Sequence, residues 1–275
     1  MTKTEYSDMR DWDDAFNNMG HVKGSDALPG FWAARAADYR RGPVRIDSDI
    51  SYGDSAREVF DLIWPDTPPR GVLVFVHGGF WMRLDKSYWT DLAEGARAHG
   101  WAVCIPSYTL TPVARISEIT KQIATAIEAV GHRVDGPIRL VGHSAGGHLA
   151  TRMICCDSLL PPKTSARIEK TISISGLHDL RPLLRTAMNA TLKLTEAEAA
   201  AESAALRRPI AGAKVTAWVG GAERPEFLRQ SQLLAMMWDG LDADTNLVVE
   251  KGHNHFTILD SMTSPNSALC SELAD

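Results

Sequence analysis

The chain has 275 residues, a formal net charge of −5 at pH 7 and a sequence pI near 6.0. It contains no basic run, which argues against a nucleic acid or an anionic membrane surface as a partner. Its N-terminus is acidic and polar, unlike a signal peptide, and no window approaches the roughly 18 apolar residues of a membrane-spanning helix. We therefore expect a cytoplasmic protein with no membrane partner.

Short apolar, β-branched segments alternate with helical patterns, and no internal repeat interrupts them. The predicted strands are 44–50, 58–64, 71–76, 101–106, 138–141, 171–175, 214–219 and 246–250. A Gly/Asp/Ser cluster between the first two predicts an antiparallel hairpin at the sheet edge, and the later strands are typical of parallel strands buried on both faces. The predicted helices are 87–99, 116–130, 145–155, 226–238 and a C-terminal segment from Phe256.

This alternation predicts a single α/β domain over residues 1–275, with a mostly parallel eight-stranded sheet flanked by helices. Residues 1–43 form an N-terminal arm that we expect to pack over the domain without a part in the chemistry. Residues 177–210 are longer than a simple crossover, and Thr195 and Glu198 fit a capping box that opens an Ala/Glu helix. We interpret 177–210 as a small cap between strands six and seven, with a functionless surface excursion as the alternative.

A serine stands where the apolar run 138–141 meets glycines, in Gly142-His143-Ser144-Ala145-Gly146. The pattern G-x-S-x-G between a strand and a helix is the context of a nucleophile elbow, although a plain glycine-rich turn would give the same letters. The small flanking residues let the strand and the helix approach closely. Ser144 is therefore the candidate nucleophile, and it requires a base, an acid and an oxyanion site elsewhere in the chain.

The oxyanion site is predicted in "FVHGGFW", which directly follows the strand 71–76. Acyl transfer places negative charge on the carbonyl oxygen, and backbone N–H groups of a glycine-rich loop can reach that oxygen. Gly78, Gly79 and Phe80 fit this need in the loop, and Ala145, the residue after the serine, supplies the second N–H. His77 is interpreted as a structural residue that fixes the loop by hydrogen bonds.

The base and the acid are expected after the last strands. His255 is preferred as the base because it directly precedes the final helical pattern, with His253 as the competing loop histidine. Glu223 follows the seventh strand and is the preferred acid. Glu226 lies in the first turn of a predicted helix, where the macrodipole favours a carboxylate for structural reasons. Asp179, after the sixth strand, is the other alternative.

Six stretches carry a family resemblance: "HGGFW", "PSYTL", "GHSAGGHLA", "SGLHDLRPL", "GGAERPEFLRQS" and "HNHF". Together, from about Val44 to the C-terminus, they resemble the arylformamidase (kynurenine formamidase) branch of the hormone-sensitive-lipase-like α/β hydrolases, whose motif is H-G-G-x-W. The resemblance implies the α/β-hydrolase fold, Ser144 as nucleophile, His255 as base and Glu223 at the acid position. It also implies Gly78, Gly79 and Ala145 around the oxyanion hole. The acid in many relatives is aspartate, so Glu223 is a longer arm.

These residues predict acyl transfer with no metal or organic cofactor. A small acyl amide or ester is the expected substrate, with arylformamides such as N-formylkynurenine first. The alternatives are a carboxylesterase or thioesterase of the same mechanism and a non-catalytic ligand-binding protein on the same fold. Trp81 and Tyr108 are candidates to line a pocket for a flat aromatic substrate, and His148 is interpreted as structural. The oligomeric state is left open, with a homodimer as one option.

Overall fold

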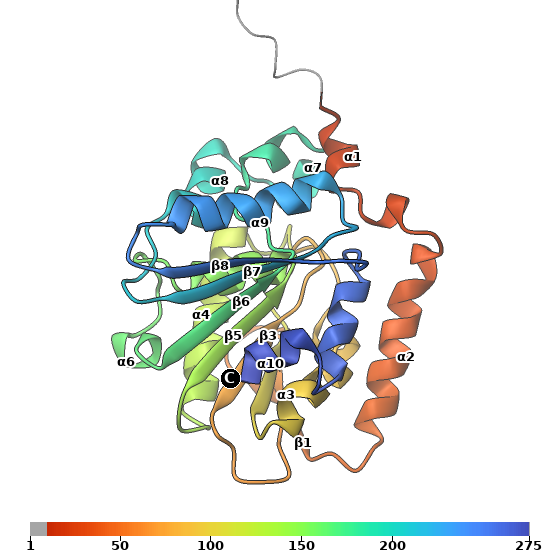
Figure 1. Ribbon diagram of the computed structural model, residues 1–275, viewed down its shortest axis with the longest axis vertical. Coiled ribbons are helices and arrows are strands. Elements are labelled where there is room, and N and C mark those ends of the chain that lie inside the picture. Colours follow the sequence, from red (N-terminus) through yellow and green to blue (C-terminus); the bar gives the residue numbers. More distant parts are fainter. Residues whose placement is uncertain (1–9, 275) are drawn as a thin grey trace, which may run out of the picture.

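The fold is built on one eight-stranded sheet, whose strands fan out across the middle of the molecule in Figure 1. The computed structural model describes residues 10–274, so the first nine residues of the predicted N-terminal arm lie outside the described residues. The strands are β1 (Ile46–Ser51), β2 (Val59–Ile63), β3 (Val72–Val76), β4 (Ala102–Pro106), β5 (Ile138–His143), β6 (Ile168–Ile174), β7 (Lys214–Gly220) and β8 (Asp244–Glu250). They lie in the order β1-β2-β4-β3-β5-β6-β7-β8. All eight predicted strands and the fold class are confirmed.

The sheet is antiparallel at one edge and parallel elsewhere. β2 pairs antiparallel with both β1 and β4, which confirms the predicted edge hairpin. The remaining neighbours pair in parallel. Because the carboxyl ends of the parallel strands lie at one edge of the sheet, the loops after β3, β5, β6, β7 and β8 are brought together there.

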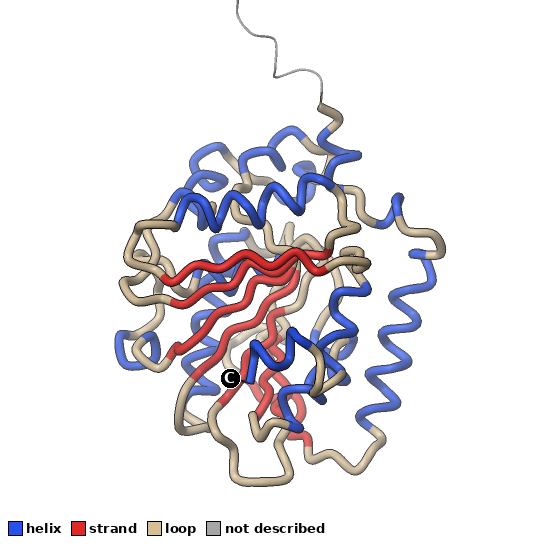
Figure 2. Tube along the Cα trace, in the orientation of Figure 1, coloured by secondary structure: helices blue, strands red, loops and turns tan. Residues whose placement is uncertain are grey.

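Helices cover both faces of the sheet, as Figure 2 shows in blue against the red strands. The alternation of side chains along β3 divides the core: Val72, Val74 and Val76 face one apolar layer, and Leu73 and Phe75 face the other. The first layer is completed by α4 (Ile116–Gly131), α5 (Ala145–Arg152) and α9 (Pro225–Trp238), and the second by α2 (Leu28–Arg40), α3 (Glu94–Ala98) and α10 (Ala268–Ala274).

Two segments that were predicted as continuous helices are divided into shorter elements. The segment predicted as one helix over 87–99 is divided into η3 (Lys86–Tyr88), η4 (Thr90–Ala93) and α3. The break falls at Trp89, whose backbone (φ −129°, ψ 9°) is not helical. Its ring packs 4.9 Å from that of Trp32, so tertiary packing of a large aromatic overrides the local helical pattern. The segment from Phe256 is similarly divided into the 3₁₀ segment η7 (Thr257–Thr263) and α10.

The segments outside the sheet scaffold are made of short helices. Residues 177–210 form η5 (Arg181–Arg185), α7 (Asn189–Leu192), α8 (Glu196–Glu202) and η6 (Ala204–Leu206), and α6 (Pro162–Ser165) precedes β6. The N-terminal segment forms α1 (Trp12–Phe16), η1 (Met19–His21), η2 (Ser25–Ala27) and then α2. No helix within residues 10–274 has both the length and the apolar character that crossing a bilayer requires.

Thr195 caps α8, as predicted, because its side chain accepts the N–H of Glu198 at 3.2 Å. The Glu198 carboxylate turns away from the cap and accepts the Ser117 hydroxyl at 2.9 Å. Arg115 forms an ion pair with the same carboxylate. These contacts attach α8 to the beginning of α4, so the predicted capping box is replaced by a tertiary contact.

Two glycines allow α5 to approach the ends of β3 and β5 closely. A Cβ placed on Gly146 would lie 1.9 Å from the carbonyl oxygen of Val76, and one on Gly142 would lie 2.0 Å from the carbonyl oxygen of Gly146. Real Cβ atoms do not approach backbone oxygens this closely, so only glycine fits at both positions. The glycines of the G-x-S-x-G pattern are therefore required by packing before any chemistry is considered.

We predict that Gly146→Ala lowers the free energy of unfolding by about 3 kcal/mol or more, since the added methyl group must displace backbone. Gly30→Ala is the matched control: Gly30 lies in α2 with no atom within 4 Å of an added Cβ, and alanine there should stabilise the helix by roughly 0.5–1 kcal/mol. Urea unfolding of both variants measures the difference. Equal stability of the two variants would contradict the role of close packing at Gly146.

Candidate active site

Ser144 lies on a sharp turn between β5 and α5. Its backbone adopts φ 56° and ψ −118°, a conformation that costs a non-glycine residue free energy and that is held here by the surrounding packing. The Ser144 N–H donates to the carbonyl of Ile174 at 2.8 Å, which fixes the turn against β6. Only 2% of the residue is exposed. The local geometry is that of a strained strand–turn–helix elbow.

Glu223 and His255 form a buried pair beside this turn. The Nδ1–H of His255 donates to Oε2 of Glu223 at 2.7 Å, and the two side chains are 5% exposed for His255 and 0% for Glu223. Oε1 of Glu223 accepts the Gly220 N–H at 2.9 Å and the hydroxyl of Ser175. The carboxylate thus has three donors, and its contact with Nδ1 leaves Nε2 as the unprotonated nitrogen of a neutral His255 ring.

His143 holds the loop that carries His255, a role that was not predicted from the sequence. Its Nε2–H donates to the backbone carbonyl of His255 at 2.8 Å, and the two rings lie 4.6 Å apart. Phe227 packs against the His255 ring at 4.4 Å. Burial lowers the pKa of His143 well below its usual value, so the ring remains a neutral donor. In the sequence, this role was indicated only by the position of His143 as the first x of G-x-S-x-G, directly before Ser144.

The alternative acids are engaged elsewhere. The Glu226 carboxylate accepts two hydrogen bonds from Arg229 at 2.7 and 2.8 Å, in the first turn of α9. The Asp179 carboxylate forms a two-atom contact with Arg181 at 2.8 and 3.0 Å. The structure brings neither of them to His255. The competing histidine, His253, donates from Nδ1 to a backbone carbonyl at 3.1 Å in an exposed turn.

The glycine-rich loop after β3 lies directly against the elbow. A Cβ on Gly78 would lie 3.0 Å from the Ser144 Cβ, and one on Gly79 would lie 2.4 Å from the carbonyl oxygen of Arg83. Gly79 and Phe80 both have positive φ, 108° and 50°. Gly78, Gly79, Phe80 and Ser144 line one pocket, so the predicted oxyanion-loop residues are brought to the serine.

Trp81 and Tyr108 do not line this pocket, in contrast to the prediction. Both are fully buried. Trp81 has φ 56°, and its ring packs edge-on against His148 at 5.1 Å. Tyr108 stacks on His77 at 4.4 Å and donates to the His77 carbonyl at 3.0 Å. The positive-φ turn at Trp81 directs its ring into the core behind the loop, and both aromatics lie outside the pocket wall.

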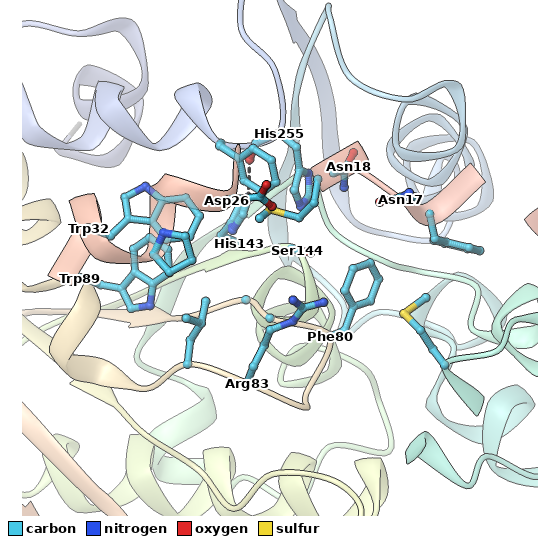
Figure 3. Close-up of a pocket in the computed structure, with 18 of the residues that line it drawn as sticks. Asn17, Asn18, Asp26, Trp32, Phe80, Arg83, Trp89, His143, Ser144 and His255 are labelled. Atoms are coloured by element: carbon cyan, nitrogen blue, oxygen red, sulfur yellow. Dashed lines mark hydrogen bonds between the residues drawn. The ribbon is translucent and has the colours of Figure 1, made fainter. Parts of the chain in front are cut away.

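The pocket in front of Ser144 has a volume of about 400 Å³ (Figure 3). The N-terminal segment supplies much of its wall, through Asp13, Phe16, Asn17, Asn18, Met19, Asp26, Pro29 and Trp32. The other lining residues are Gly78, Gly79, Phe80, Arg83, Leu84, Trp89, His143, Ser144, Met188, His255 and Phe256. Met188 is the lining residue that comes from the predicted cap, 177–210. No role in the site was predicted for the N-terminal segment, whose only signal was aromatic residues within a polar stretch.

Comparisons with known proteins agree with this geometry. A model described as an alpha/beta hydrolase family matches residues 73–265. The kynurenine formamidase of Danio rerio is 29% identical over 234 residues, 80% of this chain and 78% of that protein, and the one of Salmo salar is 28% identical over 70% and 68%.

Two solved structures are also similar. A crystal structure of a provisionally assigned thioesterase from Silicibacter sp. TM1040 is 46% identical, with a TM-score of 0.90 over 95% of this chain and 98% of that one. Esterase B of Lactobacillus rhamnosis has a TM-score of 0.69 at 16% identity, covering 94% of this chain and 92% of that one, a likeness of fold alone.

We predict that acidification destabilises the protein through its buried histidines. Burial lowers the pKa of His77 to about 4 and that of His148 and His178 to about 3, from 6.5. The unfolded chain therefore binds more protons below pH 6.5, and the stability present above that pH is lost as the pH falls toward 3 to 4. Each histidine should cost roughly 1 kcal/mol between pH 7 and pH 5.5.

His148→Gln checks this prediction, because glutamine can still donate to the Glu202 carbonyl that His148 contacts at 2.8 Å. Urea unfolding at pH 8 and pH 5.5 should show a smaller loss of stability on acidification in the variant than in the wild-type protein. The free energy of unfolding at pH 8 measures the packing that the substitution removes. The change between pH 8 and pH 5.5 measures the contribution of the titrating histidine. If the variant lost as much stability between pH 8 and pH 5.5 as the wild-type protein does, this would be evidence against the contribution of His148.

Proposed function

The chain belongs to the alpha/beta hydrolase family and is a hydrolase, and from that premise we propose that it is a serine hydrolase that cleaves a small acyl amide or ester, with arylformamides such as N-formylkynurenine as the leading substrates. The observation that carries the proposal is that His255, which lines the same pocket as Ser144, is joined at 2.7 Å to the buried carboxylate of Glu223 behind it. The kynurenine formamidases of two fishes, similar over most of this chain, support the arylformamide class.

In the proposed mechanism, Oγ of Ser144 attacks the acyl carbonyl while Nε2 of His255 takes its proton and then delivers it to the leaving group. Glu223 keeps Nδ1 of His255 protonated and stabilises the imidazolium that forms. The N–H groups of Ala145 and of Gly79 and Phe80 are proposed to stabilise the oxyanion of the tetrahedral intermediate. Hydrolysis of the acyl-enzyme repeats the same steps with water as the nucleophile.

The proposed preference for a short acyl group is supported by Phe80. Figure 3 places its ring in the pocket below Ser144, beside the loop that supplies the oxyanion donors. The wider lipase-like group that this chain resembles usually has glycine at that position, so the phenyl ring takes space that would otherwise admit a longer chain. We therefore expect formyl and acetyl groups to be preferred over longer acyl chains.

A thioesterase is the second candidate, because the 46% identical structure from Silicibacter sp. is provisionally assigned to that activity. The same residues would cleave a thioester by the same steps, since the thiolate is a better leaving group than an amine. A panel of formanilides, p-nitrophenyl esters and acyl thioesters separates the amide, ester and thioester activities by kcat/KM.

We predict that Ser144→Ala and His255→Ala each reduce kcat by about 10⁴-fold or more while the protein stays folded, because the members of a triad act as a unit. Glu223→Ala should cost less than either. A fluorophosphonate probe should label the wild-type protein and not the Ser144→Ala variant, and an unlabelled wild-type protein would favour a non-catalytic ligand-binding role.

Asp179→Ala is the control for the acid, because its carboxylate is paired with Arg181 and not with His255. It should retain most of the wild-type rate. A collapse of the rate in Asp179→Ala, together with a wild-type rate in Glu223→Ala, would show that the acid is misassigned.

We also predict that kcat/KM falls steeply across the formyl, acetyl, butyryl and octanoyl esters of one phenol, after correction for intrinsic reactivity. Each methylene group that does not fit the pocket should lower kcat/KM by about 10- to 200-fold. Phe80→Gly should relax the fall, and its backbone at φ 50° suits glycine. Phe31→Ala is the control, since that ring is 55% exposed and outside the pocket wall. A rise toward octanoyl would refute the short-acyl preference.

A further inference from the structure

Arg83 presents an uncommitted positive charge to the pocket. Figure 3 shows its side chain extending from the loop after β3 into the space in front of Ser144. Among residues 10–274 its guanidinium has no hydrogen-bond or ion-pair partner. The backbone beside it is fixed, because Arg57 donates to the carbonyls of Leu84 at 2.6 Å and of Tyr108 at 2.7 Å. Arg83 is thus held at the pocket mouth with five unused donors.

Asn18 presents a second unused donor from the opposite wall. It precedes η1 at the N-cap position, where asparagine normally bonds to the helix, but its side chain makes no capping hydrogen bond. The residue is 5% exposed, it lines the pocket, and its Nδ2 is buried without a partner. A buried, unsatisfied donor is costly in the free protein. Figure 3 shows Asn18 next to His255, which donates the proton to the leaving group in the proposed mechanism.

The other lining residues include aromatic side chains that can pack against a flat ring. Their charged side chains do not favour an anion. Trp32 lies 4.9 Å from Trp89 and 5.7 Å from Phe256, and all three line the pocket. Two carboxylates, Asp13 and Asp26, line it with Arg83. With two acids and one arginine, the formal charge of the lining does not favour an anion. A preference for an anionic ligand would therefore have to come from direct contact with Arg83.

We propose that Arg83 and Asn18 recognise an aromatic substrate that carries a carboxylate, with Arg83 binding the carboxylate and Asn18 Nδ2 donating to a second oxygen acceptor of the same molecule. Arg83 is suited to this because its planar guanidinium matches a carboxylate with two parallel hydrogen bonds. The inference rests on the proposed function only for the identity of the scissile acyl bond. The recognition itself can be measured without catalysis.

The test uses the full chain with Ser144→Ala, so that the ligand stays intact. The probes are 2-formamidobenzoate and its neutral counterpart 2-formamidobenzamide, and the fluorescence of Trp32 and Trp89 in the pocket wall reports binding. The carboxylate should bind at least about tenfold more tightly than the amide, and added salt should weaken this preference. Arg83→Met should reduce carboxylate affinity by about 10- to 100-fold and amide affinity far less. Arg133→Met, an exposed arginine outside the pocket wall, is the matched control.

Asn18→Leu separates binding from structure. Leucine has the same number and branching of side-chain heavy atoms and removes the unsatisfied donor, so the melting temperature should stay the same or rise. Affinity for both probes should nevertheless fall about tenfold. A lower melting temperature with unchanged affinities would assign Asn18 to structure and overturn its part of the proposal.

Equal affinity of the two probes in the Ser144→Ala protein, or no binding of either below about 10 mM, would overturn the role of Arg83. Failure of the proposed function has a different signature. In that case the unmutated protein would cleave no formanilide, ester or thioester, whereas the carboxylate preference and its loss in Arg83→Met would persist. Cleavage of neutral formanilides without any carboxylate preference would leave the proposed function standing and refute the recognition.

Discussion

The close approach of α5 to the ends of β3 and β5 is the constraint on which the site depends. Because Gly146 lies against the carbonyl of Val76, the helix can begin directly after the strand, and Ser144 takes a positive φ between them. β3 and β5 are neighbours in register, with Val76 beside Gly142, so the loop after β3 is delivered to the serine by the same contact. The proposed nucleophile and oxyanion donors therefore have one structural origin.

The buried polar network around His255 is the second requirement, and its members are mutually satisfied. Glu223 accepts from His255, Gly220 and Ser175, and His143 holds the backbone that carries the His255 ring. In a low-dielectric interior an unpaired carboxylate would be strongly unfavourable, whereas one with three donors is stabilised and its orientation is fixed. The longer glutamate arm suits this arrangement because it spans from the end of β7 to the ring.

The proposed catalytic residues come from one part of the chain, whereas the pocket wall comes from two. Ser144, Glu223 and His255 all lie in the region 73–265 that matches the family model, at the carboxyl edge of the sheet. The pocket wall combines residues from 13–32, which precede that region, with residues from within it, including Phe80 and Arg83. A segment outside the matched region thus contributes to the wall of the pocket in front of Ser144.

The sequence by itself determined the eight strands and the glycine-bearing elbow, because local periodicity and backbone sterics leave few alternatives there. It also indicated the residues of the proposed triad, through their positions after the strands and through the family resemblance, but it left His253, Glu226 and Asp179 as alternatives. Only the tertiary structure decided where side chains far apart in the chain meet. The side chains of Trp81 and Tyr108 lie in the core. The predicted helix 87–99 is interrupted at Trp89, whose ring packs against Trp32. Asn18 lies beside His255. These outcomes depend on packing between segments distant in sequence, and a local pattern carries no information about such contacts.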